Sequence, residues 1–136
     1  MQMHEFTDVV RHYATFTGRA RRRTFWMFIL TGILLAAGLA LIDEALGLRV
    51  STRPDGDGLL VSLLTLALLL PTIAVTVRRL HDTGRSGSNL WLLLIPLFGW
   101  LTLLAWLSED GQPRTNQWGA DPMSATGRVP TPAQND

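Results

Sequence analysis

Residues 25–42 read FWMFILTGILLAAGLALI, a run of 18 residues without a charged side chain. Two further runs share this property, namely Leu59–Val77 with 19 residues and Leu90–Leu107 with 18. At 1.5 Å per residue, 18 residues form a helix of about 27 Å, close to the roughly 30 Å of hydrocarbon in a bilayer. The runs therefore predict an all-α integral membrane protein with three transmembrane helices.

The charged residues of the chain are confined to the segments between these runs. All 23 of them lie within 81 of the 136 residues. An ordinary soluble globule mixes its charged residues along the chain, so that class of protein is excluded. A cleaved secretory signal is excluded as well, because its apolar core is only roughly 7–15 residues long and further spans do not normally follow it.

Residue types that the chain lacks exclude several kinds of chemistry. The absence of cysteine excludes a disulfide framework, a thiol nucleophile and thiolate-bound metal sites. All twelve basic residues are arginine, which excludes a Schiff-base lysine and a P-loop lysine. His4, His12 and His81 lack metal-ligand spacing, so we expect no metal and no cofactor. The arginines flank apolar runs, as membrane topology requires, and we expect no nucleic-acid partner.

The runs divide the chain into three parts. Residues 1–24 form a basic segment in which apolar residues recur at helical spacing, and this pattern predicts an amphipathic helix in the membrane interface. Residues 108–136 form a polar tail whose last dozen residues are predicted to be disordered. Between them, residues 25–107 form the three-helix membrane domain, with spans at about 25–42, 59–77 and 90–107.

The arginines predict an orientation. Three spans place residues 1–24 and the loop 78–89 on one side, and the loop 43–58 and the tail on the other. The first side carries eight arginines and the second carries four. Because arginine in short flanking segments is retained in the cytoplasm, the N-terminus is predicted to be cytoplasmic and the C-terminus to lie outside.

The densest polar segment is RRLHDTGRSG at residues 78–87. On a continuing helix Arg78 and Asp82 are spaced to pair, while Gly84 and Gly87 end the helix and turn the chain into the third span. A cluster of arginines at the interface attracts anionic headgroups by roughly 1 kcal/mol per arginine. These arginines are also explained as topology anchors, and that alternative stays open. The candidate residues for binding an anionic headgroup or a partner are Arg19, Arg22, Arg78, Arg79, His81, Asp82 and Arg85.

Three blocks of the sequence resemble a known family. They are FTGRARR at 16–22 with the Phe-Trp pair that follows, RRLHDTGRSG at 78–87, and Gly111 with NQWGADP at 116–122. The chain resembles the bacterial family known as domain of unknown function 805, small inner-membrane proteins of the YhaH kind. Gln117 and Trp118 depart from it, because the family usually has Arg and Phe or Tyr there. The resemblance implies a multi-pass protein of the bacterial inner membrane and no established activity. It adds as secondary candidates Gly18, Trp26, Gly84, Gly87, Asn116, Gly119, Asp121 and Pro122.

The function expected from these features is a non-enzymatic module that interacts with lipids or membrane proteins through a cytoplasmic arginine face. Its expected partners are anionic membrane lipids, and a second copy of the chain or another membrane protein. One alternative is an enzyme acting on a phospholipid or isoprenoid phosphate, with His81, Asp82 and an arginine clamp. Another is an oligomeric channel or carrier, although a proton or ion pump is disfavoured because the runs contain no ionisable residue.

The three-span topology separates the resembling blocks. It places the third block opposite the first two, so the three form a single site only if the third run re-enters the membrane. Pro96 and Gly99 lie near the centre of that run and make a break conceivable. We expect a full span, because irregular backbone exposed to lipid leaves polar groups unsatisfied.

Overall fold

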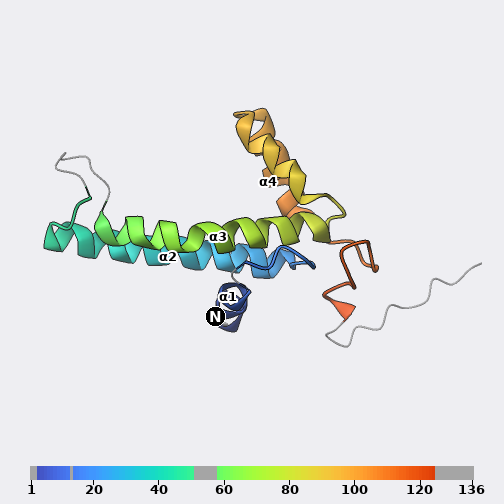
Figure 1. Ribbon diagram of the computed structural model, residues 1–136, viewed down its shortest axis with the longest axis horizontal. Coiled ribbons are helices and arrows are strands. Elements are labelled where there is room, and N and C mark those ends of the chain that lie inside the picture. Colours follow the sequence, from blue (N-terminus) through green and yellow to red (C-terminus); the bar gives the residue numbers. More distant parts are fainter. Residues whose placement is uncertain (1–2, 13, 51–57, 125–136) are drawn as a thin grey trace, which may run out of the picture. The chain divides into compact units, whose positions relative to one another are not determined.

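The computed structural model of the chain describes residues 3–12, 14–50 and 58–124, so the predicted disorder of the last dozen residues lies outside it. Over these residues every regular element is helical. The elements are α1 (Met3–Arg11), α2 (Arg22–Leu46), α3 (Leu59–Asp82), the 3₁₀ helix η1 (Gly87–Leu94) and α4 (Phe98–Ser108) (Figure 1). The chain divides into two compact units, Met1–Thr15 with Thr24–Ala74 and Phe16–Arg23 with Val75–Asp136.

Helices α2 and α3 contain the first and second predicted spans. Both are long and apolar enough to cross a membrane. Helix α2 has 25 residues and α3 has 24, so each extends beyond its charge-free run. At 1.5 Å per residue they are about 36 Å long or more, which exceeds the roughly 30 Å hydrocarbon thickness. The helices predicted over residues 25–42 and 59–77 are therefore confirmed.

Within the first unit, α2 and α3 run antiparallel and side by side (Figure 1). A side chain added at Gly32 would meet the side chain of Leu68 at 3.6 Å, so Leu68 of α3 packs against α2 at this glycine. Helix α1 packs through Phe6, whose ring stacks on that of Phe28 with centroids 5.3 Å apart. The helix predicted near the N-terminus is thus confirmed, while its place in the membrane interface stays a prediction.

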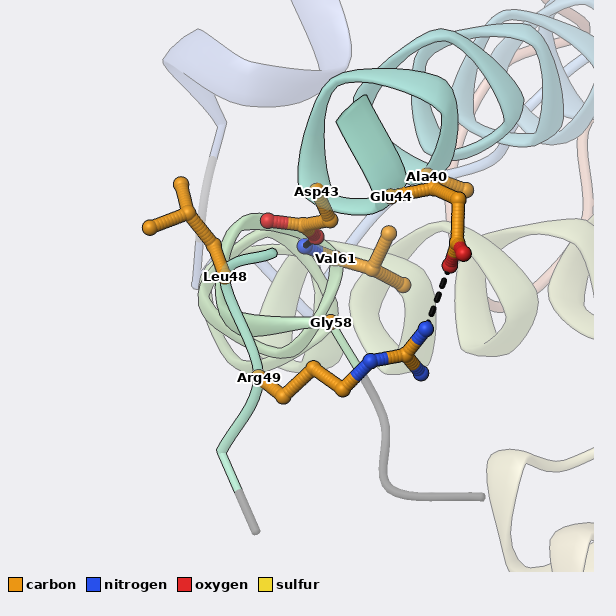
Figure 2. A pocket seen from close by; sticks show the side chains of 7 residues that line it. All are labelled: Ala40, Asp43, Glu44, Leu48, Arg49, Gly58 and Val61. Atoms are coloured by element: carbon orange, nitrogen blue, oxygen red, sulfur yellow. Dashed lines mark hydrogen bonds and ion pairs between the residues drawn. The ribbon is translucent and has the colours of Figure 1, made fainter. Parts of the chain in front are cut away.

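Asp43 joins the two long helices at their connected ends. Its buried carboxylate accepts hydrogen bonds from the backbone N–H groups of Leu60 and Val61, each at 3.0 Å. These N–H groups belong to the first turn of α3, which has no intrahelical acceptor for them. The neighbouring Glu44 instead points outward and pairs with Arg49 at 2.5 Å (Figure 2). Asp43 therefore caps α3 from the end of α2.

The third predicted span, Leu90–Leu107, is not formed as one helix. The structure has η1 over the first part, a break at residues 95–97, and α4 over the last part. Helix α4 has only 11 residues, about 16 Å, which is too short to cross the bilayer. Helices η1 and α4 pack against each other, so residues 87–108 form a hairpin, called here the apolar hairpin.

The break has a local cause. Pro96 disfavours helical backbone at the residue before it, and Ile95 is extended, with φ −101° and ψ 100°. Leu97 has φ 61° and ψ −71°, and the N–H of Phe98 donates to the carbonyl of Pro96 at 2.8 Å, which together define a γ-turn. A side chain at Gly99 would collide with the carbonyl oxygen of Leu92. The chain reverses here because proline and glycine occupy these positions.

Removing the Asp43 cap tests the connection of the two long helices. Asp43→Ala leaves two N–H groups of α3 without their acceptor, so we expect a loss of about 1–2 kcal/mol in the free energy of unfolding in detergent micelles. Glu44→Ala is the matched control and should change it by less than about 1 kcal/mol, because its ion pair is exposed. Equal effects of the two variants would contradict the capping role.

Candidate functional site

The second unit brings together three segments that are far apart in the sequence. They are residues 18–22 before and at the start of α2, the end of α3 with the turn after it, and residues 107–122 after the apolar hairpin. The backbone joins them directly. The N–H of Ala20 donates to the carbonyl of Arg78 at 3.0 Å, and the N–H of Gln112 donates to the carbonyl of Asp82 at 2.8 Å.

The carboxylate of Asp82 lies at the centre of this arrangement. Oδ1 accepts a hydrogen bond from Nε of Arg19 at 2.9 Å, and Oδ2 accepts one from Nη1 of Arg79 at 2.5 Å. The side chain of Asp82 is 5% exposed, that of Arg19 is 1% exposed and that of Arg79 is 0% exposed. We call these three residues the Asp82 cluster. One buried carboxylate between two buried guanidinium groups leaves a net charge of +1, which other polar groups must solvate.

Backbone carbonyls solvate Arg19. Besides its bond to the Asp82 carboxylate, the guanidinium donates to the carbonyls of Gln112 and Arg114, each at 2.5 Å, and to those of Asp82 and Gly119, each at 3.4 Å. A guanidinium has five N–H donors, and five acceptors surround this one. Arg19 therefore has no donor left for an external ligand.

Backbone carbonyls also accept hydrogen bonds from Arg79. Its Nε donates to the carbonyl of Leu107 at 3.1 Å, and its terminal nitrogens donate to the carbonyls of Ala20 and Glu109 as well as to Asp82. Leu107 and Glu109 flank the last residue of α4. Arg79 thus ties the end of the apolar hairpin to the end of α3.

His81 is buried between the same segments. Its Nδ1 lies 3.1 Å from the carbonyl oxygen of Gly18, and the ring of Trp118 stacks on the imidazole with centroids 4.6 Å apart and an interplanar angle of 8°. Asn116 donates to the carbonyl of His81 at 2.9 Å and accepts from the N–H of Trp118 at 3.0 Å. These contacts make His81 part of the packing that holds residues 116–118.

Two glycines let the segments approach. Gly84 has φ +80°, and the N–H groups of Gly84 and Arg85 donate to the carbonyls of His81 and Leu80, which is the Schellman pattern at a helix end. This confirms that Gly84 ends the helix. A side chain at Gly111 would collide with the carboxylate of Asp82. The loop that follows α4 can cover Asp82 only because residue 111 is glycine.

Two ion pairs lie at the rim of the cluster, one exposed and one partly buried. Arg22 pairs with Asp110 at 3.0 Å, with side chains 54% and 88% exposed. Arg85 pairs with Glu109 at 2.7 Å and lies 4.5 Å from the centroid of the Trp106 ring. A cavity of about 460 Å³ opens beside these groups, and its lining includes Arg21, Arg22, Asp82, Asp110, Asp121 and Met123.

Most of the predicted site residues meet in this unit. Arg19, Arg79, His81 and Asp82 share the buried cluster, whereas Arg22 and Arg85 lie on its rim. Among the secondary candidates, Gly119 and Pro122 supply carbonyls to Arg19 and Arg21, and Gly87 lies against Val77. Trp26 is in the other unit, edge-on to Phe25.

Sequence reasoning did not find several members of the site. It paired Asp82 with Arg78, whereas the carboxylate pairs with Arg19 and Arg79, and Arg78 contributes its backbone carbonyl. It also missed Gln112 and the carbonyls that accept from the guanidinium groups. A carbonyl carries no sequence signal, because every residue has one.

The contacts of Arg19 differ from the expectation that the third block lies on the other side of the membrane from the first two. Three full spans place the third block opposite the first two. In the structure, Arg19 instead contacts residues 112, 114 and 119 directly, so residues 16–22 of the first block form one site with the other two blocks. The expected arrangement assumed one continuous helix over residues 90–107, whereas the structure has two helices that pack against each other there.

Neutralising the carboxylate tests the Asp82 cluster. Asp82→Asn leaves two buried guanidinium groups without their counter-charge, so we expect a loss of about 3–5 kcal/mol in the free energy of unfolding in detergent. Asp110→Asn removes the exposed partner of Arg22 and should cost at most about 1 kcal/mol. A small effect of Asp82→Asn would contradict the central place given to this carboxylate.

A methyl group added at residue 111 tests whether the loop after α4 packs over the Asp82 carboxylate. Gly111→Ala places Cβ against the Asp82 carboxylate, so we expect the loop to be displaced and trypsin to cleave the exposed Arg114 faster, by about tenfold for each 1.4 kcal/mol of lost closure. Gly38→Ala is the control, because a Cβ there meets open space. Unchanged cleavage of Gly111→Ala would show that the loop does not close over Asp82.

Comparison with known proteins identifies the family of the chain. The family described as protein of unknown function DUF805 matches residues 13–120, which contain the whole Asp82 cluster. The inner membrane protein YhaH of Escherichia coli K12 is 41% identical over 117 residues, covering 86% of this chain and 94% of YhaH. The inner membrane protein YhaI of the same strain is 38% identical over 120 residues, covering 88% and 96%. No solved structure matches the chain. The chain belongs to the DUF805 family of membrane proteins, whose activity is not known.

Proposed function

We propose that this chain is a non-enzymatic inner-membrane module that binds anionic lipid headgroups through the exposed arginines at the start of α2. The observation that carries the proposal is the division of the arginines into two classes. Arg19 and Arg79 are buried and engaged by Asp82 and backbone carbonyls, whereas the side chain of Arg22 is 54% exposed beside an open cavity. The headgroup-binding role falls to Arg22 and the exposed Arg23.

The proposed site lies on the cytoplasmic side. With two spans, residues 1–24, the end of α3 and all that follows it share one side, and they contain ten of the twelve arginines. The loop between α2 and α3 contains the other two, Arg49 and Arg53. This ratio of ten to two supports a cytoplasmic N-terminus more strongly than the eight to four of a three-span topology. The tail is then cytoplasmic as well.

The ion pair of Arg22 does not oppose this role. Its partner Asp110 is 88% exposed, and an exposed pair contributes only about 0–1 kcal/mol. A phosphate oxygen is a comparable acceptor that brings its own negative charge. Exchange of Asp110 for a lipid phosphate therefore costs little.

The enzyme alternative draws less support from the geometry. A general base must reach the proton that it removes. The ring of His81 is covered by Trp118, its Nδ1 contacts the Gly18 carbonyl, and His81 does not line the cavity beside Arg22. Asp82 does line that cavity, but both its oxygens accept from arginine.

Removing the exposed charges tests the proposal. At roughly 1 kcal/mol per arginine, the double variant Arg22→Gln, Arg23→Gln should weaken the preference for phosphatidylglycerol over phosphatidylcholine by about 30-fold. The measurement is lipid selectivity in mixed nanodiscs by native mass spectrometry. The matched variant Arg22→Lys, Arg23→Lys keeps the charges and should keep most of the preference. Unchanged selectivity of the glutamine variant would overturn the proposal.

A further inference from the structure

The apolar hairpin exposes many large apolar side chains. Its residues, 87–108, include no charged side chain. Its most exposed side chains lie on both arms and at the tip, with exposed fractions between 66% and 74%, and they are Trp91, Leu94, Leu97, Phe98 and Leu101. A soluble domain rarely leaves such a contiguous apolar surface in water. Some apolar medium must cover the hairpin.

We infer that this hairpin is a re-entrant membrane segment, which enters the hydrocarbon core and returns to the same side. Its occupant is the acyl-chain region of the bilayer that α2 and α3 span. A helix that lies in the interface has one polar face, and α4 has no charged residue on any face. A helix that is apolar all round is immersed in an apolar medium.

The two ends of the hairpin are both held at the C-terminal end of α3. Gly87, which begins η1, lies against Val77 of α3. At the other end, Arg79 donates to the carbonyl of Leu107, and Arg85 pairs with Glu109. Both ends therefore lie beside the polar end of α3, so the hairpin does not finish on the opposite side.

The length of the arms matches half of a bilayer. Eight residues of 3₁₀ helix at about 2.0 Å per residue give about 16 Å, and the 11 residues of α4 at 1.5 Å per residue give the same. Half of the hydrocarbon core is about 15 Å. Arms of this length that run along the membrane normal place the tip, residues 95–98, near the middle of the bilayer.

Several backbone N–H groups at the tip have hydrogen-bond acceptors within the hairpin. The N–H of Ile95 donates to the Leu92 carbonyl, and that of Gly99 donates to the Ile95 carbonyl. The γ-turn pairs Phe98 with Pro96, which has no N–H of its own. On the side of the arms, the indole of Trp100 donates to the carbonyl of Leu93 at 3.0 Å. These bonds reduce the number of unsatisfied polar groups that the irregular backbone brings into lipid.

Single cysteines test the inference, because the chain has none of its own. In sealed vesicles of known orientation, Ser88→Cys and Ser108→Cys at the two ends should react with a membrane-impermeant maleimide from the same side. Val50→Cys, in the loop between α2 and α3, should react from the opposite side and serves as the control. Labelling of Ser88→Cys and Ser108→Cys from opposite sides would overturn the inference in favour of a full span.

The tip requires a second measurement. A nitroxide at Leu97→Cys should collide with oxygen more often than with a water-soluble nickel complex, as should one at Leu66→Cys, an exposed position within α3. Preferential collision with nickel would overturn the inference, as would strong spin–spin coupling between Leu97 labels on two copies, because a second chain would then cover the tip. These outcomes do not depend on headgroup binding at Arg22, so the two proposals succeed or fail separately.

Discussion

One buried carboxylate, that of Asp82, organises the second unit. Each of its two oxygens accepts a hydrogen bond from a different arginine. Two guanidinium groups that are almost completely buried have no other anion within the cluster, and a buried charge is tolerated only when it is paired and hydrogen-bonded. Arg19 comes from the segment before α2 and Arg79 from the end of α3, so the pairing joins the two long helices at their polar ends. The excess positive charge then demands further acceptors, and the segment after α4 supplies them.

Those further acceptors are backbone carbonyls, which has consequences for the fold. The carbonyls of Leu107 and Gln112 can reach Arg79 and Arg19 only if the chain comes back to the end of α3 after its third apolar run. The γ-turn at Leu97 makes this return possible, although positive φ at leucine is strained. The buried cluster and the reversed hairpin are thus two parts of one arrangement, in which hydrogen bonds to charged groups offset local backbone strain.

Prediction from the sequence succeeded where a single property decided the outcome. Helices α2 and α3 follow from two long charge-free runs, and the end of α3 follows from Gly84. It failed for the run 90–107, whose hydropathy and length match a span as well as the other two do. Pro96 and Gly99 were visible there, but both residues occur in membrane helices that span, so their presence alone does not distinguish a kink from a reversal. Contact between Gly99 and Leu92 decides between them.

The sequence by itself determined that the chain is a helical membrane protein with arginines gathered beside its apolar runs, because hydrophobicity and charge are properties of each residue and add along the chain. Only the tertiary structure decided which arginines are buried. Arg19 and Arg22 are three residues apart and equally basic, yet one is enclosed by five acceptors and the other faces solvent. That difference arises from carbonyl groups about 90 residues away in sequence, and a carbonyl is the same in every residue. Burial and partner choice are therefore properties of the folded chain.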